Sequence, residues 1–234
     1  MRVYPLAAAA AAAVLGVAGC SGGDEPEPAS DTDPAAMLET AAGLLGQTSG
    51  LRFTMEGENL PDAGMVIIGA DGLAAPPASF EGDIRIATSG LAATIEVVSV
   101  NGQLWAKLPL TEDFAQMDAA SLGFSDPGLL LDPDHGVGQL LRSAEDPAHA
   151  DQVRVGSEVF DQVTATLPGE LVGRLLTITD PAAQVQAVFA LDTGTGHLRQ
   201  AILTGPFVPN GADQTYTVRL DDYDQAVDIS APED

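Results

Sequence analysis

The chain has 234 residues, of which 34 are Asp or Glu and nine are Lys or Arg, so its formal net charge is -25 at pH 7. Such a surface repels the phosphates of nucleic acids, which argues against nucleic-acid binding, and it is held away from anionic lipid headgroups. We interpret the acidity as a source of solubility rather than as a site. The single cysteine excludes an internal disulfide bond.

Residues 1–19 have the plan of a bacterial export signal. Arg2 precedes an Ala-rich apolar run from about Leu6 to Val17, and small residues follow it. Spanning a membrane needs roughly 20 apolar residues, so this shorter run favours a cleaved signal over an anchor helix. No other apolar stretch of the sequence is long enough to span a membrane.

The end of that signal, Val17-Ala18-Gly19-Cys20, resembles the lipobox of bacterial lipoproteins, in which an aliphatic residue and two small residues precede an invariant cysteine. The resemblance implies that Cys20 becomes the first mature residue and carries a diacylglyceryl group on its sulfur. Two acyl chains suffice for stable anchoring, so we expect the protein on the outer face of a plasma membrane. A buried structural thiol is the weaker alternative.

A flexible tether is expected at residues 20–36. Between Ser21 and Pro34 the sequence has Gly, Pro and five acidic residues but no apolar residue larger than Ala. Such a composition cannot offset the entropy lost on ordering. Residues 37–234 remain, enough for one domain with a sizeable core.

The domain is predicted to begin with a helix and to continue with strands. Apolar residues recur at helical spacing from Met37 to Leu45, after the start signal Asp33-Pro34. Beyond Gly50 the period changes to two, and Asn101-Gly102 is a hairpin signal. The alternation predicts antiparallel strands at residues 51–56, 66–68, 80–86, 91–97 and 104–108, and a turn at residues 69–72 is expected to close the second of them.

The middle of the sequence differs, because Asp126-Pro127 and Asp132-Pro133 each precede a short apolar run and so predict two short helices. A further short helix is expected at residues 169–176. Strands are expected again at residues 152–155, 159–166, 185–191, 198–204, 215–220 and 226–229. Runs of strands with a few helices between them predict an α+β fold with a large antiparallel sheet.

Five stretches of the domain stand in a recognisable order: residues 80–84, FEGDI; 97–110, VVSVNGQLWAKLPL; 126–136, DPGLLLDPDHG; 203–207, LTGPF; and 216–223, YTVRLDDY. With the lipobox upstream, these stretches resemble the actinobacterial, mycobacterial-type cell-envelope lipoproteins of the LppX, LprA, LprF and LprG family. The resemblance covers about residues 37–232.

That resemblance implies a strongly curved antiparallel half-barrel, with helices covering its concave face around an apolar cavity. It implies a membrane-anchored carrier that holds the acyl chains of lipids or glycolipids and moves them across the cell envelope, sometimes beside an export permease, with no cofactor. Periodicity alone would favour an ordinary packed core. The inward-facing candidates are Ile84, Ile86, Leu91, Ile95, Val97 and Leu104 on strands, with Leu129, Leu130, Val137, Leu140, Leu171 and Leu175 as helical cover.

The sequence offers no metal-binding or catalytic constellation. His135, His149 and His197 do not have the spacing of metal ligands. The stretch from Asp132 begins like a calcium loop, but Ser143 stands where a twelve-residue loop needs an acid, so we favour a helix N-cap. Neither a Gly-x-Ser-x-Gly elbow nor a phosphate-binding loop occurs. We therefore expect that the protein is not an enzyme.

Two rival hypotheses remain beside the lipid carrier. In the first, the protein is an interaction or accessory subunit whose acidic face docks another envelope protein. In the second it is a hydrolase of envelope lipids, for which the sequence supplies no catalytic group.

The anchor prediction can be tested by removing the sulfur. In Cys20→Ala the site of acylation is lost, and because two acyl chains provide the stable membrane contact, we expect the protein to leave the membrane fraction of the host cells. Immunoblotting of membrane and soluble fractions measures this shift. Persistent membrane association would mean that the signal stays uncleaved or that another contact dominates.

Overall fold

The structure, a computed structural model, describes residues 32–62, 64–155, 157–209 and 212–232. The predicted signal, Cys20 and the first part of the predicted tether lie outside the described residues. The predicted tether extends too far along the chain. Residues 34–36, which we assigned to the tether, already belong to helix α1 (Pro34–Leu45). The helix starts there because the Asp33 carboxylate accepts hydrogen bonds from the backbone N–H groups of Ala35 and Ala36, at 2.8 and 3.3 Å.

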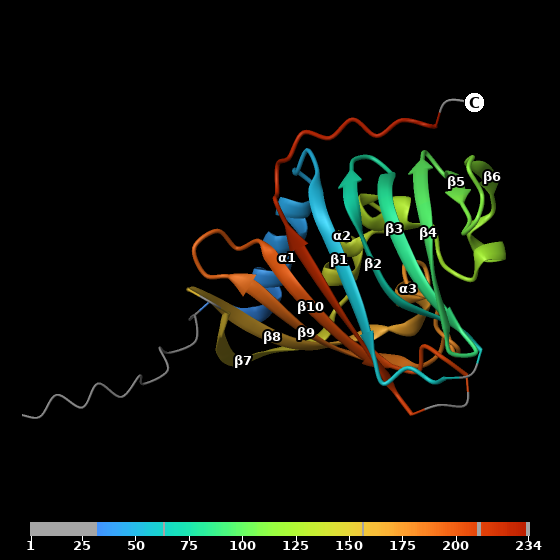
Figure 1. The fold of residues 1–234 in the computed structure, drawn as a ribbon. Coiled ribbons are helices and arrows are strands. Elements are labelled where there is room, and N and C mark those ends of the chain that lie inside the picture. Colours follow the sequence, from blue (N-terminus) through green and yellow to red (C-terminus); the bar gives the residue numbers. More distant parts are fainter. Residues whose placement is uncertain (1–31, 63, 156, 210–211, 233–234) are drawn as a thin grey trace, which may run out of the picture.

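One antiparallel sheet organises the described residues (Figure 1). It contains eleven strands in the described part of the chain, in the spatial order β6-β5-β4-β3-β2-β1-β11-β10-β9-β8-β7. The strands are β1 (Leu51–Glu58), β2 (Met65–Ala75), β3 (Ser79–Thr88), β4 (Leu91–Val100), β5 (Gln103–Lys107), β6 (Ala115–Met117), β7 (Glu145–Val155), β8 (Glu158–Pro168), β9 (Gln184–Asp192), β10 (Leu198–Gly205) and β11 (Gln214–Asp221). Strands that are neighbours in sequence pair with each other, except β6 and β7, which form the two edges of the sheet. In addition, β1 pairs with β11 and so joins the two halves.

Short helices lie on one face of the curved sheet, as Figure 1 shows for α1, α2 and α3. Besides α1 they are the 3₁₀ helices η1 (Ala119–Leu122) and η2 (Pro127–Leu131), and the α-helices α2 (Val137–Arg142) and α3 (Gly169–Val172). The predicted α+β class with a large curved antiparallel sheet is confirmed. The helix expected at 169–176 is shorter than predicted, because its α-helical part ends at Val172.

Two strand predictions were wrong. We predicted that the strand beginning at Val66 would end in a turn at residues 69–72, but these residues lie inside β2, which runs on to Ala75. We also predicted a strand at 226–229, yet that segment is irregular. It crosses the convex face of the sheet, where Ile229 packs with Ala75 and Val98 in a small apolar cluster.

A single large core fills the concave side of the sheet. Its buried members come from α1, η2, α2 and α3 as well as from the strands, and include Leu38, Leu51, Phe80, Val163 and Leu220. Both apolar clusters of the described chain take all their members from residues 37–229. The apolar core of the described residues is therefore built entirely from residues that follow the predicted tether.

Two glycines allow the backbones of β2 and β3 to approach each other closely. Gly72 and Gly82 are paired across these strands, and a Cβ atom on Gly82 would overlap the Asp71 carbonyl oxygen and the Gly72 Cα atom. A Cβ on Gly72 would meet the ring of Phe80. The two backbones therefore approach more closely than side chains would permit, as glycine in a strand often allows.

We predict that Gly82→Val destabilises the domain. The new side chain must push β2 and β3 apart, and overpacking of this kind costs about 1–3 kcal/mol. For a domain of this size each kcal/mol lowers the melting temperature by about 2–4 °C, so it should fall by roughly 2–12 °C. Gly43→Ala is the control, since Gly43 lies in α1 with open space around its Cα, and Ala there should raise the melting temperature slightly. Equal melting temperatures for wild type and Gly82→Val would contradict the close approach.

Candidate functional site

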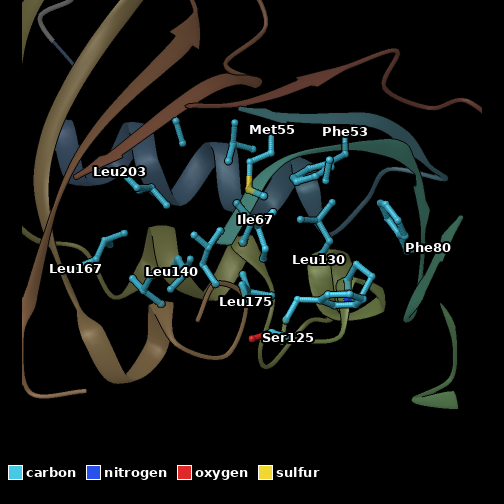
Figure 2. Close-up of a pocket in the computed structure, with 18 of the residues that line it drawn as sticks. Phe53, Met55, Ile67, Phe80, Ser125, Leu130, Leu140, Leu167, Leu175 and Leu203 are labelled. Atoms are coloured by element: carbon cyan, nitrogen blue, oxygen red, sulfur yellow. The ribbon is translucent and has the colours of Figure 1, made fainter. Parts of the chain in front are cut away.

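An apolar cavity lies between the concave face of the sheet and its helical cover (Figure 2). The cavity has a volume of about 90 Å³, and the atom-free space that continues from it, open solvent included, amounts to about 950 Å³. Its floor is formed by Phe53, Met55, Ile67, Ala70, Phe80, Ile84, Leu167, Phe189, Leu198, Ala201, Leu203 and Val218. Its cover is formed by Phe124, Ser125, Pro127, Leu130, Val137, Leu140, Val172, Leu175 and Leu176.

The floor follows from strand periodicity and register. Side chains alternate between the two faces of a strand, and antiparallel pairing sets Ala70, Met55, Val218, Ala201 and Phe189 side by side across β2, β1, β11, β10 and β9. The row contains two alanines, Ala70 and Ala201, among larger residues. Because Ala is too short to reach the cover, the row leaves space beside its larger neighbours.

Serine is the single polar side chain in the lining. The Ser125 hydroxyl donates a hydrogen bond to the Gly173 carbonyl oxygen at 3.4 Å. This bond links the loop between η1 and η2 to the end of α3. Since every other lining residue is apolar, the cavity can hold hydrocarbon by burial.

Five of the twelve residues predicted to face a cavity line it. They are Ile84, Leu130, Val137, Leu140 and Leu175.

Another three of the twelve, Ile95, Val97 and Leu104, are buried in the core outside the lining. Ile86 and Leu171 are partly buried against the core, and Leu129 is partly buried. Leu91 does not line the cavity; it is 74% exposed at the start of β4.

Several lining residues were not among our candidates. Phe53 and Met55 alternate along β1, and Phe189, Ala201 and Leu203 come from strands late in the sequence. The alternation that marks these strands was visible, but the pairing of β1 with β11, which brings the late strands beside the early ones, is not encoded in a local pattern. Four phenylalanines line the cavity. The rings of Phe53 and Phe80 pack edge to face, with 6.1 Å between their centroids.

Within the described residues no group of three or more His, Cys, Asp and Glu side chains could hold a metal ion. The start of the apparent calcium loop has another role: Asp132 accepts hydrogen bonds from the backbone N–H groups of Asp134 and His135. Burial alone would raise the pKa of Asp132, but these hydrogen bonds and the one to the His135 ring outweigh it and lower the pKa. The predicted helix N-cap needs correction, since the N-cap of α2 is Gly136 and Asp132 closes the preceding turn.

The convex face carries charges where the concave face is apolar. Asp71, Asp83 and Glu96 are neighbours in register on β2, β3 and β4. Burial, together with the nearby Asp71 and Glu96 carboxylates, raises the pKa of Asp83, although Arg85 opposes the shift. Lys107, the only lysine of the sequence, forms a 3.2 Å ion pair with Glu96.

In the described part of the chain, none of the helices is both long enough and apolar enough to cross a membrane.

The curved antiparallel sheet, its helical cover and the apolar cavity between them define a half-barrel protein with an internal hydrophobic site. Comparison with known proteins narrows this class to one family. The family model described as LppX_LprAFG lipoprotein matches residues 33–229, and the chain belongs to this family. The resemblance indicated by the five sequence stretches is thereby confirmed.

Two curated relatives align over nearly their whole length. The lipoarabinomannan carrier protein LprG of Mycobacterium tuberculosis is 24% identical over 236 residues, which cover 99% of this chain and 95% of LprG. The lipoprotein LprA of the same organism is 24% identical over 244 residues, which cover 98% of this chain and 97% of LprA. The family is thus one of lipoproteins in which one relative is named a carrier, and this supports lipid binding at the level of the family.

Two solved structures share the fold. LprF from Mycobacterium bovis has a TM-score of 0.68 and 13% identity, over 88% of this chain and 99% of LprF. LppX from Mycobacterium tuberculosis has a TM-score of 0.60 and 15% identity, over 86% of this chain and 100% of LppX. At these identities the likeness shows the fold alone, and it agrees with the single curved sheet described above.

Proposed function

We propose that this protein is a membrane-anchored lipoprotein that binds the acyl chains of a lipid or glycolipid in its cavity and carries that lipid across the cell envelope. The observation that carries the proposal is the composition of the cavity: 20 of its 21 lining residues are apolar and the remaining one is Ser125. The lipobox supports anchoring through Cys20 on the outer face of the plasma membrane. The name of the relative LprG, a lipoarabinomannan carrier, supports transport of a glycolipid.

Burial of hydrocarbon would provide the binding energy. Each methylene group moved from water into the cavity contributes about 0.8 kcal/mol, so ten buried methylenes contribute about 8 kcal/mol before any cost of rearrangement. The lining contains no charged side chain that could pair with a charged headgroup. The sugar or phosphate part of the ligand is therefore placed at the opening, with the Ser125 hydroxyl as the nearest polar group of the lining.

Binding requires the cavity to enlarge. An apolar cavity of ~150 Å³ holds one benzene molecule, and the cavity here is smaller, about 90 Å³. The cover is suited to this change, because η2, α2 and α3 are helices of four to six residues. A long acyl chain would displace these helices or rotate the leucines that they carry.

Recovery of a co-purifying lipid tests the proposal directly. Residues 32–234, which hold both apolar clusters of the described residues, are expressed with an export signal in the native host, purified without detergent, and extracted with organic solvent for mass spectrometry. We expect an acylated lipid in the extract. Protein from the native host that yields no lipid would contradict the carrier proposal and favour the accessory subunit.

A bulky side chain in the floor should lower the lipid occupancy. Ile84 lines the cavity and is 4% exposed, so Ile84→Trp fills space that an acyl chain needs. The control is Ile202→Trp, because Ile202 is partly buried on β10 and is absent from the lining. Native mass spectrometry should show a loss of most bound lipid in Ile84→Trp and wild-type occupancy in Ile202→Trp. Circular dichroism establishes that both variants fold, and equal occupancy in both would remove Ile84 from the binding site.

A further inference from the structure

The apolar concave face continues past the helical cover to one end of the sheet. There, Met65 at the start of β2 pairs with Thr88 at the end of β3, and Thr88 pairs with Leu91 at the start of β4. Met65 is 48% exposed and Leu91 is 74% exposed. We call these three residues the rim. It lies where β2 starts, β3 ends and β4 starts, and these strand ends are at the bottom of the sheet in Figure 1. Among the described residues, only Leu110 is a further exposed large hydrophobic residue.

The rim borders the cavity on two sides. Along β2, the residue that follows Met65 on the same face is Ile67, which lines the cavity. Across the opening, the Met65 methyl group lies against Gly123, where an added Cβ atom would overlap it. Gly123 is followed directly by Phe124 and Ser125, which also line the cavity. Apolar surface therefore runs from the exposed rim to the interior without a charged side chain between them.

The rim is also an uncharged region in a strongly acidic protein. The segments that meet there, residues 64–70, 86–95 and 119–125, contain no Asp, Glu, Lys or Arg. Elsewhere the acidic residues are frequent enough to give the chain a net charge of -25. The rim is thus an end of the domain that can approach a lipid surface without burying its own charges or repelling anionic headgroups.

We propose that the rim contacts the surface of a lipid bilayer and is the portal through which an acyl chain passes between that bilayer and the cavity. The second part of this inference, the passage of the acyl chain, rests on the proposed function. Exposed large apolar side chains are costly in water, and when grouped they mark interaction sites. A lipid bilayer is the partner that matches the rim, because the rim offers apolar contact and no charged group that would specify a protein partner.

The proposed anchor is compatible with this contact. Cys20 precedes Asp33 by 13 positions, and a stretch of that length spans at most about 45 Å when extended. The domain would therefore stay close to the membrane that holds its acyl chains. A rim of two exposed side chains makes a weak and reversible contact, which suits a protein that must also leave the surface with its ligand.

Vesicle binding tests the rim without the anchor. Residues 32–234, which lack Cys20, are mixed with phosphatidylcholine vesicles, and the bound fraction is measured by flotation. Burial of one leucine side chain is worth a factor of about ten or more in partitioning, so we expect Leu91→Ser and Met65→Ser each to weaken binding about tenfold. Leu110→Ser is the matched control, since Leu110 is fully exposed but lies near Glu112 and Asp113 in sequence, and it should bind like the wild type.

A fluorescent reporter provides a second measurement. The domain without Cys20 contains no cysteine, so Leu91→Cys and Leu110→Cys can each be labelled with one environment-sensitive dye. We expect the emission of the dye at position 91, and not at position 110, to shift to shorter wavelength when vesicles are added. Absence of vesicle binding by the wild-type domain, or equal effects at both positions, would overturn the inference.

The outcomes separate the rim from the proposed function. If lipid co-purifies with the domain but the wild type does not bind vesicles, the rim inference fails and the carrier function stands. If the domain binds vesicles through Leu91 but never holds a lipid, the membrane contact stands and both the carrier function and the portal fail. If both hold, Leu91→Ser should slow the uptake of lipid from vesicles about as much as it weakens binding, while leaving the amount bound at equilibrium unchanged.

Discussion

The pairing of β1 with β11 is the constraint on which the rest of the structure depends. Each half of the sheet is a meander of neighbouring strands, and the register of Arg52–Glu58 against Thr215–Asp221 joins the first half to the last. Since strands twist with a fixed hand, a sheet of this width curls and acquires a concave face. Met55 and Val218 meet at the joint and form the middle of the cavity floor. Without this pairing the two meanders would have separate apolar faces and no shared cavity.

Alternation along the strands then separates two kinds of surface. On β3, Ile84 faces the cavity while its neighbour Asp83 lies on the convex face beside Asp71 and Glu96. The raised pKa of Asp83, caused first by burial and then by these carboxylates, reflects the cost of gathering negative charge there. Acidic side chains thus keep the outer surface soluble. Most large apolar residues of the strands face the concave side, in the core and at the rim. The charge pattern and the proposed membrane contact are thus two consequences of one periodicity.

Local patterns were sufficient for much of the fold. The helix after Asp33, the hairpin at Asn101-Gly102 and most strands follow from capping, turn and alternation signals. Two errors share a cause in tertiary structure. The glycines at 69 and 72 looked like a turn, yet they serve the close approach of β2 and β3, and Leu91 has the correct face but lies beyond the cover. The candidate site was predicted only in part, because the contribution of β9 to β11 depends on a pairing between residues more than 150 positions apart.

The closed form of the cavity is itself part of the proposed mechanism. A carrier must not expose a large apolar surface to water, and the helical cover keeps the apolar lining within a cavity of about 90 Å³. A single hydrogen bond, from the Ser125 hydroxyl to the Gly173 carbonyl oxygen, links the loop between η1 and η2 to the end of α3. Such a bond stabilises the closed form by only about 1 kcal/mol. Opening therefore depends mainly on the apolar contacts of the short helices, and an incoming acyl chain replaces those contacts with its own. The free energy of lipid binding is then the difference between the burial energy of the acyl chain and that of the displaced helix contacts. Because these two energies are similar, the lipid can be bound and released without chemical energy at the site.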